Sequence, residues 1–409
     1  MNKRLSRRHG GHGGHGILSR WMGLVSKSRV FRGCFFLIFL FSFFSCGGSP
    51  DDPSDWREAE PLYKIYENDF LLGNVISFPR DTENDRFILL KRHFNTVTPE
   101  NHMKPENIAP SSRPADNNWV YRWNSADDIV DTARVNGMNV VGHTLIWHSQ
   151  TPSWLTTGTR TEVLGNLNKY IADVAGHFKG KLIAWDVVNE AMKESNNISA
   201  SDAMNWSSCL RDSGWKTNIG PDYIEKAFLA AREADPDAKR YYNDYNLNNP
   251  NKRDAVFNMV EDINGRYPKT GGRPLIEGIG MQTHHHLGTD PETVKDAIKK
   301  FALLGVEIAI SEMDIQAAGD LPKVGIVTWG DKAAQDQAVM YATLFKIFKE
   351  NYQVISRVTF WGIDDDTSWI DLENGNLKPS NRRAYPTLLN GDYSLKPAFF
   401  AVMDPSRYE

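Results

Sequence analysis

Eight short apolar runs recur along the chain, separated by segments whose apolar residues repeat with the period of an α-helix. The runs are expected to form strands at 70–78, 94–101, 139–148, 182–190, 239–246, 277–286, 306–314 and 357–365. Helical periodicity is clear between several of them, as in 164–178 and 334–348. Eight strand–helix units in roughly 345 residues predict an α/β fold of the (β/α)8, or TIM-barrel, type in a single domain.

A doubly wound parallel sheet is the competing fold for such a pattern. It would carry a glycine-rich phosphate-binding turn after its first strand, and none follows 70–78. Local helix signals fit either fold: Asp290 with Pro291 predicts a capped helix start, and Asp222 with Glu225 predicts a capping box. The barrel is preferred because polar and aromatic residues gather where the expected strands end, which is where the functional residues of a barrel lie.

The first 45 residues have the features of a secretory leader. Eight of them are Lys or Arg and none is acidic, and they end in an apolar stretch at 34–44. That stretch has the length of the hydrophobic core of a signal peptide and is too short to cross a bilayer as a helix. We therefore expect a signal peptide at 1–45, with Met22 as a possible true start because 22–45 alone has an ordinary signal length.

Ser45 and Cys46 resemble the lipobox of bacterial lipoproteins, in which the Cys becomes the lipidated first residue. We expect lipidation at Cys46, secretion across the inner membrane, and attachment as an outer-membrane or cell-surface lipoprotein of a bacterium. A plain secretory signal cut at small residues nearby is the alternative. The segment 46–58 is rich in Gly, Pro, Ser and Asp and predicts a tether, which leaves 59–409 as the folded domain.

Charge and cysteine content narrow the function further. Without the leader, 39 basic residues face 51 acidic ones, a net charge of about −12 that argues against a nucleic-acid partner. Cys209 is the one cysteine beyond Cys46, so it has no partner for an intrachain disulfide and is expected to be a buried bystander.

The expected strands end on two carboxylates, several amides and imidazoles, and a set of aromatic rings. In chain order the candidate site residues are Glu100, Asn101, Lys104, His143, Trp147, Asn189, Glu190, Tyr245, Gln282, His284, Glu312, Trp361 and Trp369. We expect neither a metal nor a cofactor, because His284, His285 and His286 are consecutive and alternate in direction on a strand. The acidic run 364–366 is interpreted as an exposed loop rather than a cation site.

This set of side chains suits a carbohydrate site. Amides and carboxylates bind vicinal hydroxyls, and Trp rings stack on the apolar face of a pyranose. A single Glu at a strand end is more often a structural cap than a catalyst. Glu190 and Glu312, however, occur together with amides, imidazoles and aromatic rings at the strand ends. Two carboxylates are what glycoside hydrolysis needs, one to protonate the leaving oxygen and one to attack or to activate water.

Seven stretches occur in the order of the signature stretches of one enzyme family. They are FNTVTPENHMK, GHTLIWHSQTPSWL, WDVVNEA, YYNDYN, GIGMQTHH, ISEMDI and FWGIDDDTSW. They resemble those of the family-ten glycoside hydrolases, whose usual activity is endo-1,4-β-xylanase. The resemblance covers nearly the whole chain after the tether and makes 59–409 the expected (β/α)8 catalytic domain.

The resemblance implies roles for individual residues. Glu190 would be the acid/base and Glu312 the nucleophile of a retaining double displacement, with their carboxyls about 5 to 5.5 Å apart. Asn189 would bind the 2-hydroxyl of the sugar being cleaved, and His284 would bind the nucleophile or its neighbourhood. The other candidates would bind sugar: Glu100, Asn101, Lys104, His143, Trp147 and Gln282 on the glycone side, Tyr245 on the aglycone side, and Trp361 and Trp369 over the cleavage position.

Two rival functions remain open at this stage. The same fold could cut β-1,4-glucan, which differs at the subsite that admits or excludes a hydroxymethyl group. A non-catalytic glycan-binding surface lipoprotein would also use aromatic rings and a lipid anchor, but it would not need both Glu190 and Glu312. We expect a monomer whose partner is a β-1,4-linked polysaccharide, xylan, and which meets the membrane only through its lipid.

Overall fold

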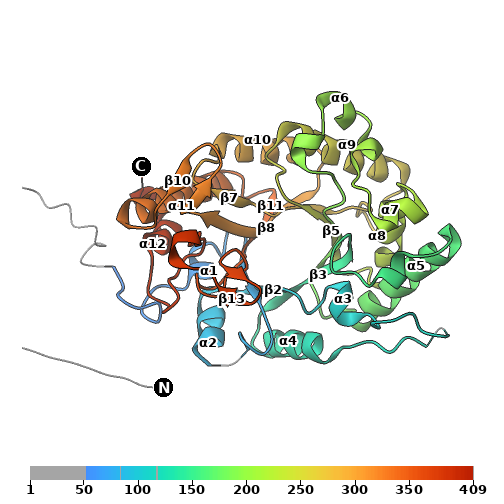
Figure 1. Ribbon diagram of the computed structural model, residues 1–409, viewed down its shortest axis with the longest axis horizontal. Coiled ribbons are helices and arrows are strands. Elements are labelled where there is room, and N and C mark those ends of the chain that lie inside the picture. Colours follow the sequence, from blue (N-terminus) through green and yellow to red (C-terminus); the bar gives the residue numbers. More distant parts are fainter. Residues whose placement is uncertain (1–51, 83, 117, 409) are drawn as a thin grey trace, which may run out of the picture. The chain divides into compact units, whose positions relative to one another are not determined.

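Eight parallel strands form the centre of the computed structural model, which describes residues 52–82, 84–116 and 118–408 (Figure 1). The strands are β1 (Leu71–Ile76), β2 (Thr96–Pro99), β3 (Asn139–Trp147), β4 (Ala184–Asn189), β5 (Lys239–Asp244), β6 (Gly278–Met281), β8 (Glu307–Gln316) and β11 (Ile355–Phe360). Each pairs with the next, and β11 pairs with both β8 and β1, which closes the barrel. The predicted (β/α)8 fold is confirmed, and every predicted strand is present.

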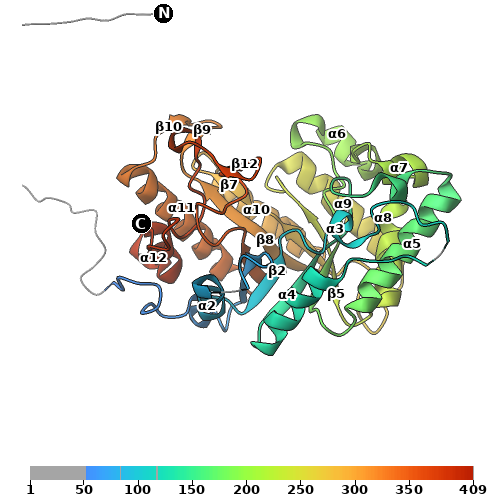
Figure 2. The same cartoon turned by 60° about the horizontal axis from the view of Figure 1, so that its bottom comes forward.

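One principal helix follows each barrel strand, and these helices surround the strands (Figures 1 and 2). They are α2 (Asn84–His93), α4 (Asn124–Val135), α5 (Arg160–His177), α8 (Tyr223–Ala234), α9 (Pro250–Arg266), α10 (Pro291–Ala302), α11 (Asp331–Glu350) and α12 (Pro397–Met403). Their apolar faces cover the outside of the barrel, where Phe178, Phe228 and Phe301 are fully buried.

Shorter elements occupy the connections. The helical ones are α1 (Leu62–Ile65), α3 (Pro105–Ile108), α6 (Ala200–Ala203), α7 (Gly214–Ile219) and the 3₁₀ turns Ser153–Thr156, Ser195–Asn197, Trp206–Cys209, Ser380–Arg382 and Pro405–Arg407. The extended ones are β7 (His284–His286), β9 (Gly319–Leu321), β10 (Gly325–Val327), β12 (Leu372–Glu373) and β13 (Asn376–Leu377). β7 pairs with the last residues of β8, beyond the end of β6.

Helix starts follow local side-chain chemistry, with one correction to the expectations. Asp290 caps α10 by accepting a hydrogen bond of 3.0 Å from the Glu292 amide, and Pro291 takes the first helical position, as predicted. The capping box predicted at Asp222 is wrong, because Asp222 has helical backbone angles and its carboxylate binds Arg160 instead. A capping box does occur at the start of α5, where the Thr159 side chain and Glu162 satisfy each other's backbone amides.

Large side chains on both faces of the barrel strands require small neighbours. A Cβ atom on Gly142 would lie 2.2 Å from the Trp185 ring, and one on Gly278 would lie 2.1 Å from the Tyr241 ring. Only glycine fits at these positions on the strands. Cys209 is buried, as expected of a bystander thiol.

The acidic run 364–366 is not the exposed loop that the sequence predicts. Asp364 and Asp365 are each 1% exposed, and only Asp366 lies at the surface. Asp364 pairs with the Arg86 guanidinium, while Asp365 accepts from Lys396 at 3.0 Å. Internal cations therefore neutralise the two buried carboxylates, which is how proteins make such burial tolerable.

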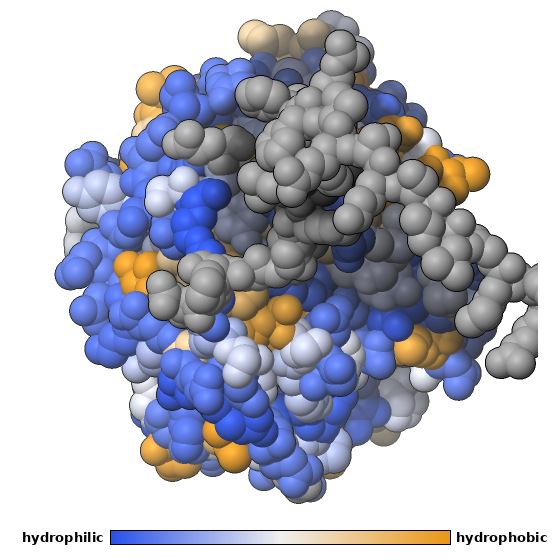
Figure 3. Space-filling view, turned by 90° about the vertical axis from the view of Figure 1, so that its left-hand side faces the viewer, coloured by the Kyte–Doolittle hydropathy of each residue, from blue (hydrophilic) through white to orange (hydrophobic). Residues whose placement is uncertain are grey.

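The signal peptide expected at 1–45 and the lipidation site expected at Cys46 lie outside the described residues. Trp56, inside the segment predicted as a tether, is 2% exposed and its ring packs edge-on against that of His93. Among the described residues, no helix is both long and apolar enough to cross a membrane. The face seen in Figure 3 is mainly hydrophilic, with apolar residues in small separate groups, as is ordinary for a protein surface.

Candidate active site

The thirteen candidate residues all line one cavity of about 590 Å3 at the carboxyl ends of the barrel strands. Residues more than 200 positions apart in sequence meet there because parallel strands in a closed barrel end on the same face. Gln150 and Asn246 complete the lining and were not among the candidates. The cavity therefore contains both carboxylates, Glu190 and Glu312, together with the predicted amides, imidazoles and aromatic rings.

Glu312 is the more enclosed of the two carboxylates. It lies within β8, is 5% exposed, and accepts a 2.6 Å hydrogen bond from Asn243 of β5. His284 lies on its other oxygen at 3.3 Å. Burial alone would raise the pKa of Glu312, but the hydrogen bonds from His284 and Asn243 and the positive charge of His284 outweigh it and lower that pKa. Glu312 is thus held as a carboxylate.

His284 owes its charge to a second carboxylate behind it. Its Nδ1 lies 2.7 Å from Asp314, and the Trp369 indole donates to the same Asp314 oxygen at 3.1 Å. Burial opposes a charged imidazole, yet Asp314 and Glu312 together raise the pKa of His284 to about 10. Asp314, which ends a predicted strand, is therefore a supporting residue that the candidate list lacked.

Glu190 follows directly after β4 in a left-handed backbone conformation, with φ of 52°. This conformation costs a non-glycine residue on the order of 1 to 2 kcal/mol, and it turns the side chain into the cavity. A bond of 2.8 Å from the Glu190 amide to the Asn243 carbonyl holds the turn. The carboxylate accepts from the Trp147 indole at 2.9 Å and from the Gln282 amide at 3.0 Å.

The Asn189 amide lies at the last position of β4, among the groups that hold the two carboxylates. It is 2.9 Å from the Asn243 amide and 3.2 Å from that of Gln282. Asn189 is 3% exposed and Asn243 is fully buried. One amide network therefore connects the surroundings of Glu190 with those of Glu312.

Glu100, Asn101 and Lys104 form one end of the cavity, after β2. Lys104 donates to Asn101 at 2.8 Å and lies 4.9 Å from the centre of the Trp147 ring. Burial lowers the pKa of Lys104, although the surrounding carboxylates oppose the shift. Glu100 is fixed by bonds from Ser77 at 2.6 Å and from Arg80 at 3.1 Å. These groups offer fixed donors and acceptors to a ligand rich in hydroxyls.

His143 and Trp361 form the floor of the cavity. The two rings meet edge to face with their centres 5.3 Å apart. His143 Nδ1 lies 2.9 Å from the buried carboxylate of Asp186, which orients the imidazole. Trp361 is 6% exposed, whereas Trp369 is 48% exposed. Trp369 therefore offers far more free ring surface to a ligand than Trp361 does.

Arg211 joins Glu190 to Tyr245 and was missed in the sequence. Its Nε donates to the Glu190 carbonyl at 2.8 Å, and one Nη donates to the Tyr245 hydroxyl at 2.8 Å. The Tyr245 hydroxyl donates in turn to Glu194. Arg211 lies in the long connection between β4 and α8, not at a strand end, so no strand pattern points to it.

Among the described residues, no group of three or more His, Cys, Asp or Glu side chains is arranged to hold a metal ion. His284 and His286 are half-buried on one side of β7, and His285 between them is buried on the other. The polar groups of the cavity are instead paired with one another. What the arrangement offers is two carboxylates in different surroundings beside amides and aromatic rings.

Comparison with known proteins decides the family. The model for glycosyl hydrolase family 10 matches residues 61–405, inside the predicted domain of 59–409. The chain belongs to glycosyl hydrolase family 10. A relative, the beta-1,4-xylanase of Dictyoglomus thermophilum, is 38% identical over 348 residues, which is 85% of this chain and 91% of that protein.

Endo-1,4-beta-xylanase A of Thermotoga maritima is also 38% identical, over 368 residues and 85% of this chain, which spans only 31% of that longer protein. Among solved structures, a family-10 xylanase with a bacterial Ig-like domain, from termite gut, superposes with a TM-score of 0.76 at 32% identity. That match covers 87% of this chain and 79% of the other. The family-10 barrel therefore accounts for nearly all of the described residues.

Proposed function

We propose that the protein is a retaining endo-1,4-β-xylanase, with Glu312 as the nucleophile and Glu190 as the acid/base. The observation that carries the proposal is that two carboxylates share one cavity in contrasting environments. Glu312 is buried and kept negative by His284 and Asn243, which suits a nucleophile. Glu190 is less enclosed and is held by the neutral donors Trp147 and Gln282. Retaining glycosidases use two such carboxyl groups.

In the first step, Glu312 attacks the anomeric carbon while Glu190 protonates the departing glycosidic oxygen. The C–O bond to the leaving sugar breaks as the bond from Glu312 forms, and the product is a glycosyl-enzyme. Glycosylation removes the negative charge of Glu312, so that charge no longer opposes a negative charge on Glu190. Glu190 can then take a proton from water as that water displaces Glu312, and two inversions give net retention.

Substrate contacts follow from the same cavity. Asn189 is assigned to the 2-hydroxyl of the sugar being cleaved, because its amide lies within the network around both carboxylates. Glu100, Asn101 and Lys104 bind glycone hydroxyls, and Tyr245 stacks under the first aglycone sugar. The exposed ring of Trp369 covers the cleavage position. Aromatic stacking with hydrogen bonds at its edges is the usual way a protein binds a pyranose ring.

Hydrolysis of arabinoxylan, glucuronoxylan and carboxymethylcellulose, measured side by side by release of reducing ends, tests this function. We expect turnover of both xylans and little of the cellulose derivative. A preference for carboxymethylcellulose would instead establish the β-1,4-glucanase on the same fold. Binding to xylan without any hydrolysis would establish the glycan-binding lipoprotein.

We also propose that the mature protein is anchored to a bacterial membrane through lipid on Cys46. The basic leader, the apolar stretch at 34–44 and the small residue before Cys46 support this. Two-phase detergent extraction of bacteria that express the full chain tests the proposal. Cys46→Ala is expected to move the protein into the soluble fraction, whereas Cys34→Ala, a matched change within the leader, retains anchoring. Equal membrane retention of both variants would refute the lipid anchor.

A further inference from the structure

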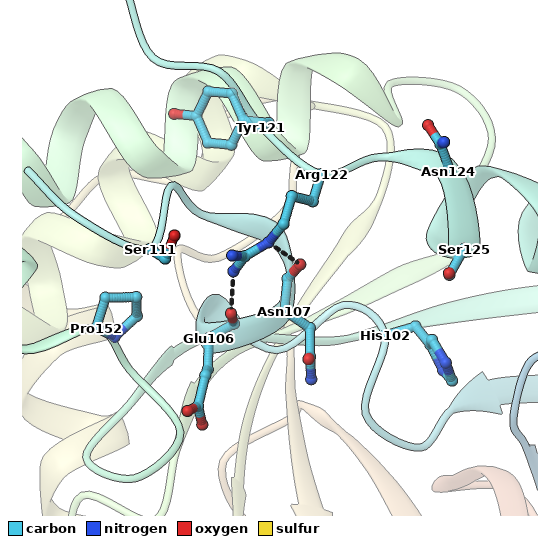
Figure 4. A pocket seen from close by; sticks show the side chains of 9 residues that line it. All are labelled: His102, Glu106, Asn107, Ser111, Tyr121, Arg122, Asn124, Ser125 and Pro152. Atoms are coloured by element: carbon cyan, nitrogen blue, oxygen red, sulfur yellow. Dashed lines mark hydrogen bonds between the residues drawn. The ribbon is translucent and has the colours of Figure 1, made fainter. Parts of the chain in front are cut away.

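A second surface cavity, of about 730 Å3, lies beside the catalytic one and plays no part in the proposed chemistry (Figure 4). It lies between α3, the start of α4 and the extended segment before α4. The lining residues are His102, Glu106, Asn107, Ser111, Tyr121, Arg122, Asn124, Ser125 and Pro152. Eight of these nine side chains can form hydrogen bonds. Tyr121 also has an aromatic ring, which stacks on Trp123 with the ring centres 4.6 Å apart, and its hydroxyl donates to Asp173 at 2.7 Å. Polar side chains and aromatic rings also line the catalytic cavity, which has three Trp rings in addition.

The two cavities share a wall. Asn101 and Gln150 line the catalytic cavity, whereas Asn107 and Glu106 line the second one. The Asn107 amide donates to the Asn101 carbonyl at 2.8 Å, and the Glu106 backbone amide donates to the Gln150 carbonyl at 2.7 Å. The second cavity is therefore built on residues that also shape the glycone end of the catalytic one.

The polar side chains of this cavity are largely unused by the protein itself. No side chain of Glu106, Ser111, Asn124 or Ser125 forms a hydrogen bond or ion pair with a described residue. Arg122 donates to the Asn107 carbonyl at 3.1 Å and to that of Glu106, while the Glu106 carboxylate points away from the guanidinium (Figure 4). Donors and acceptors are thus available to a ligand within one concave surface.

The charge of the cavity limits the class of ligand. One guanidinium, on Arg122, and one carboxylate, on Glu106, leave it without a strong field of either sign, which disfavours phosphates and other highly charged ligands. Four unpaired hydrogen-bonding side chains in a cavity that also includes the partly exposed Tyr121 ring suit an uncharged ligand rich in hydroxyls. We propose that this cavity binds a second stretch of the polysaccharide chain whose other part occupies the catalytic cavity.

This inference rests on the proposed xylanase function, and it predicts a defect confined to long substrates. A double variant, Glu106→Ala with Asn124→Ala, removes two unpaired groups from exposed positions. One hydrogen bond to a ligand is worth roughly a twofold to tenfold change in affinity, so the loss of two is expected to raise KM for polymeric xylan about fourfold or more. Kinetics on 4-nitrophenyl β-xylobioside, which fills only the catalytic cavity, should stay at the wild-type level.

Two further variants sharpen the comparison. Asp128→Ala removes one negative charge from an exposed position of α4 outside the cavity and is expected to behave as wild type on both substrates. Ser125→Leu fills the cavity with an apolar side chain and should reproduce the defect on the polymer. An unchanged KM for xylan in both cavity variants would overturn the proposal, and so would an equal loss on the two substrates, since that would place the effect in the catalytic cavity.

Binding and hydrolysis measurements together distinguish an error in the second-site proposal from an error in the proposed function. Electrophoresis through gels containing xylan, with every protein in the Glu312→Gln background, measures binding without turnover. Weaker retardation of the double variant than of the Asp128→Ala control is expected. Equal retardation would refute the second site even where the wild-type enzyme hydrolyses xylan, whereas wild-type inactivity on the xylobioside would refute the xylanase assignment alone.

Discussion

Glu190 and Glu312 are chemically identical side chains to which their neighbours give different chemistry. Glu312 accepts from a charged imidazole and a buried amide. Glu190, in a strained backbone conformation, accepts from an indole and another buried amide and has no charged donor. The two environments make each glutamate suited to one of the two roles and poorly suited to the other. Removing them one at a time should therefore produce two distinguishable defects.

Glu312→Ala is expected to abolish the glycosyl-enzyme. Azide can then enter the space left by the carboxylate and attack the anomeric carbon directly, because Glu190 still assists the leaving group. The product should be an α-xylosyl azide, with the configuration inverted relative to the β-linked substrate. Identification of the azide product by NMR checks this, and a product of retained configuration would contradict the nucleophile role.

Glu190→Ala should spare the first step for nitrophenyl glycosides, whose leaving group needs no proton. Loss of general acid/base assistance costs about 10² to 10⁴-fold, so turnover of polymeric xylan should fall within that range. Azide should restore turnover of the nitrophenyl substrate and give a β-xylosyl azide. Steady-state rates with and without azide measure the effect, and the absence of any azide rescue would remove Glu190 from the acid/base role.

His284→Gln is expected to move the acid limb of the pH profile of kcat/KM to higher pH. The wild-type imidazolium, with a pKa of about 10, helps to lower the pKa of Glu312, which must be ionised to attack. Without that charge the pKa of Glu312 rises, so a larger fraction is protonated and inactive at low pH. His286→Gln, on the same strand but without a contact to Glu312, is the matched control. An unchanged acid limb in His284→Gln would exclude this electrostatic role.

Residue types at the active site were predictable because barrel strands deliver their last residues to one face. The partners of those residues were not. Arg211 reaches Glu190 and Tyr245 from a connecting loop, and the position of a loop depends on tertiary packing. The burial of Asp364 could not be predicted for a similar reason, because its partner, Arg86, lies 278 residues away in sequence.

At the scale of single elements, strands and helices form where their sequence patterns predict them. The prediction of a helix cap failed where a side chain had two possible hydrogen-bonding partners. Asp222 with Glu225 matched the sequence pattern of a capping box, but a nearby arginine binds the Asp222 carboxylate. Thr159 and Glu162 matched the same pattern and do form the box. A motif of four residues cannot reveal which groups the rest of the chain brings near.

Thr159→Ala should lower the free energy of unfolding by about 1 kcal/mol, since it leaves amides at the start of α5 without their cap. Asp222→Ala at the start of α8 should change it by less than about 0.5 kcal/mol, because Asp222 makes no capping bond and its exposed pair with Arg160 contributes little. Urea unfolding followed by circular dichroism measures both. A larger loss in Asp222→Ala than in Thr159→Ala would reverse the assignment of the caps.

At the scale of the whole molecule, closure of the barrel is what turns eight separate strand ends into one site. Pairing of β11 with both β8 and β1 brings Trp361, just after β11, next to His143 of β3. A second cavity lies behind the wall formed by 101–107 and is lined by unpaired polar side chains. The number and order of strands could be predicted from periodicity, whereas the second cavity depends on how α3 and the segment before α4 pack.

The anomeric configuration of the first product tests the central claim most directly. Wild-type enzyme acting on xylan, followed by ¹H NMR within the first minutes and before mutarotation, shows which anomer is released. A double displacement through Glu312 predicts that the β anomer forms first and the α anomer appears only later, by mutarotation. Initial release of the α anomer would mean that water attacks the sugar directly, and it would contradict the nucleophile role of Glu312.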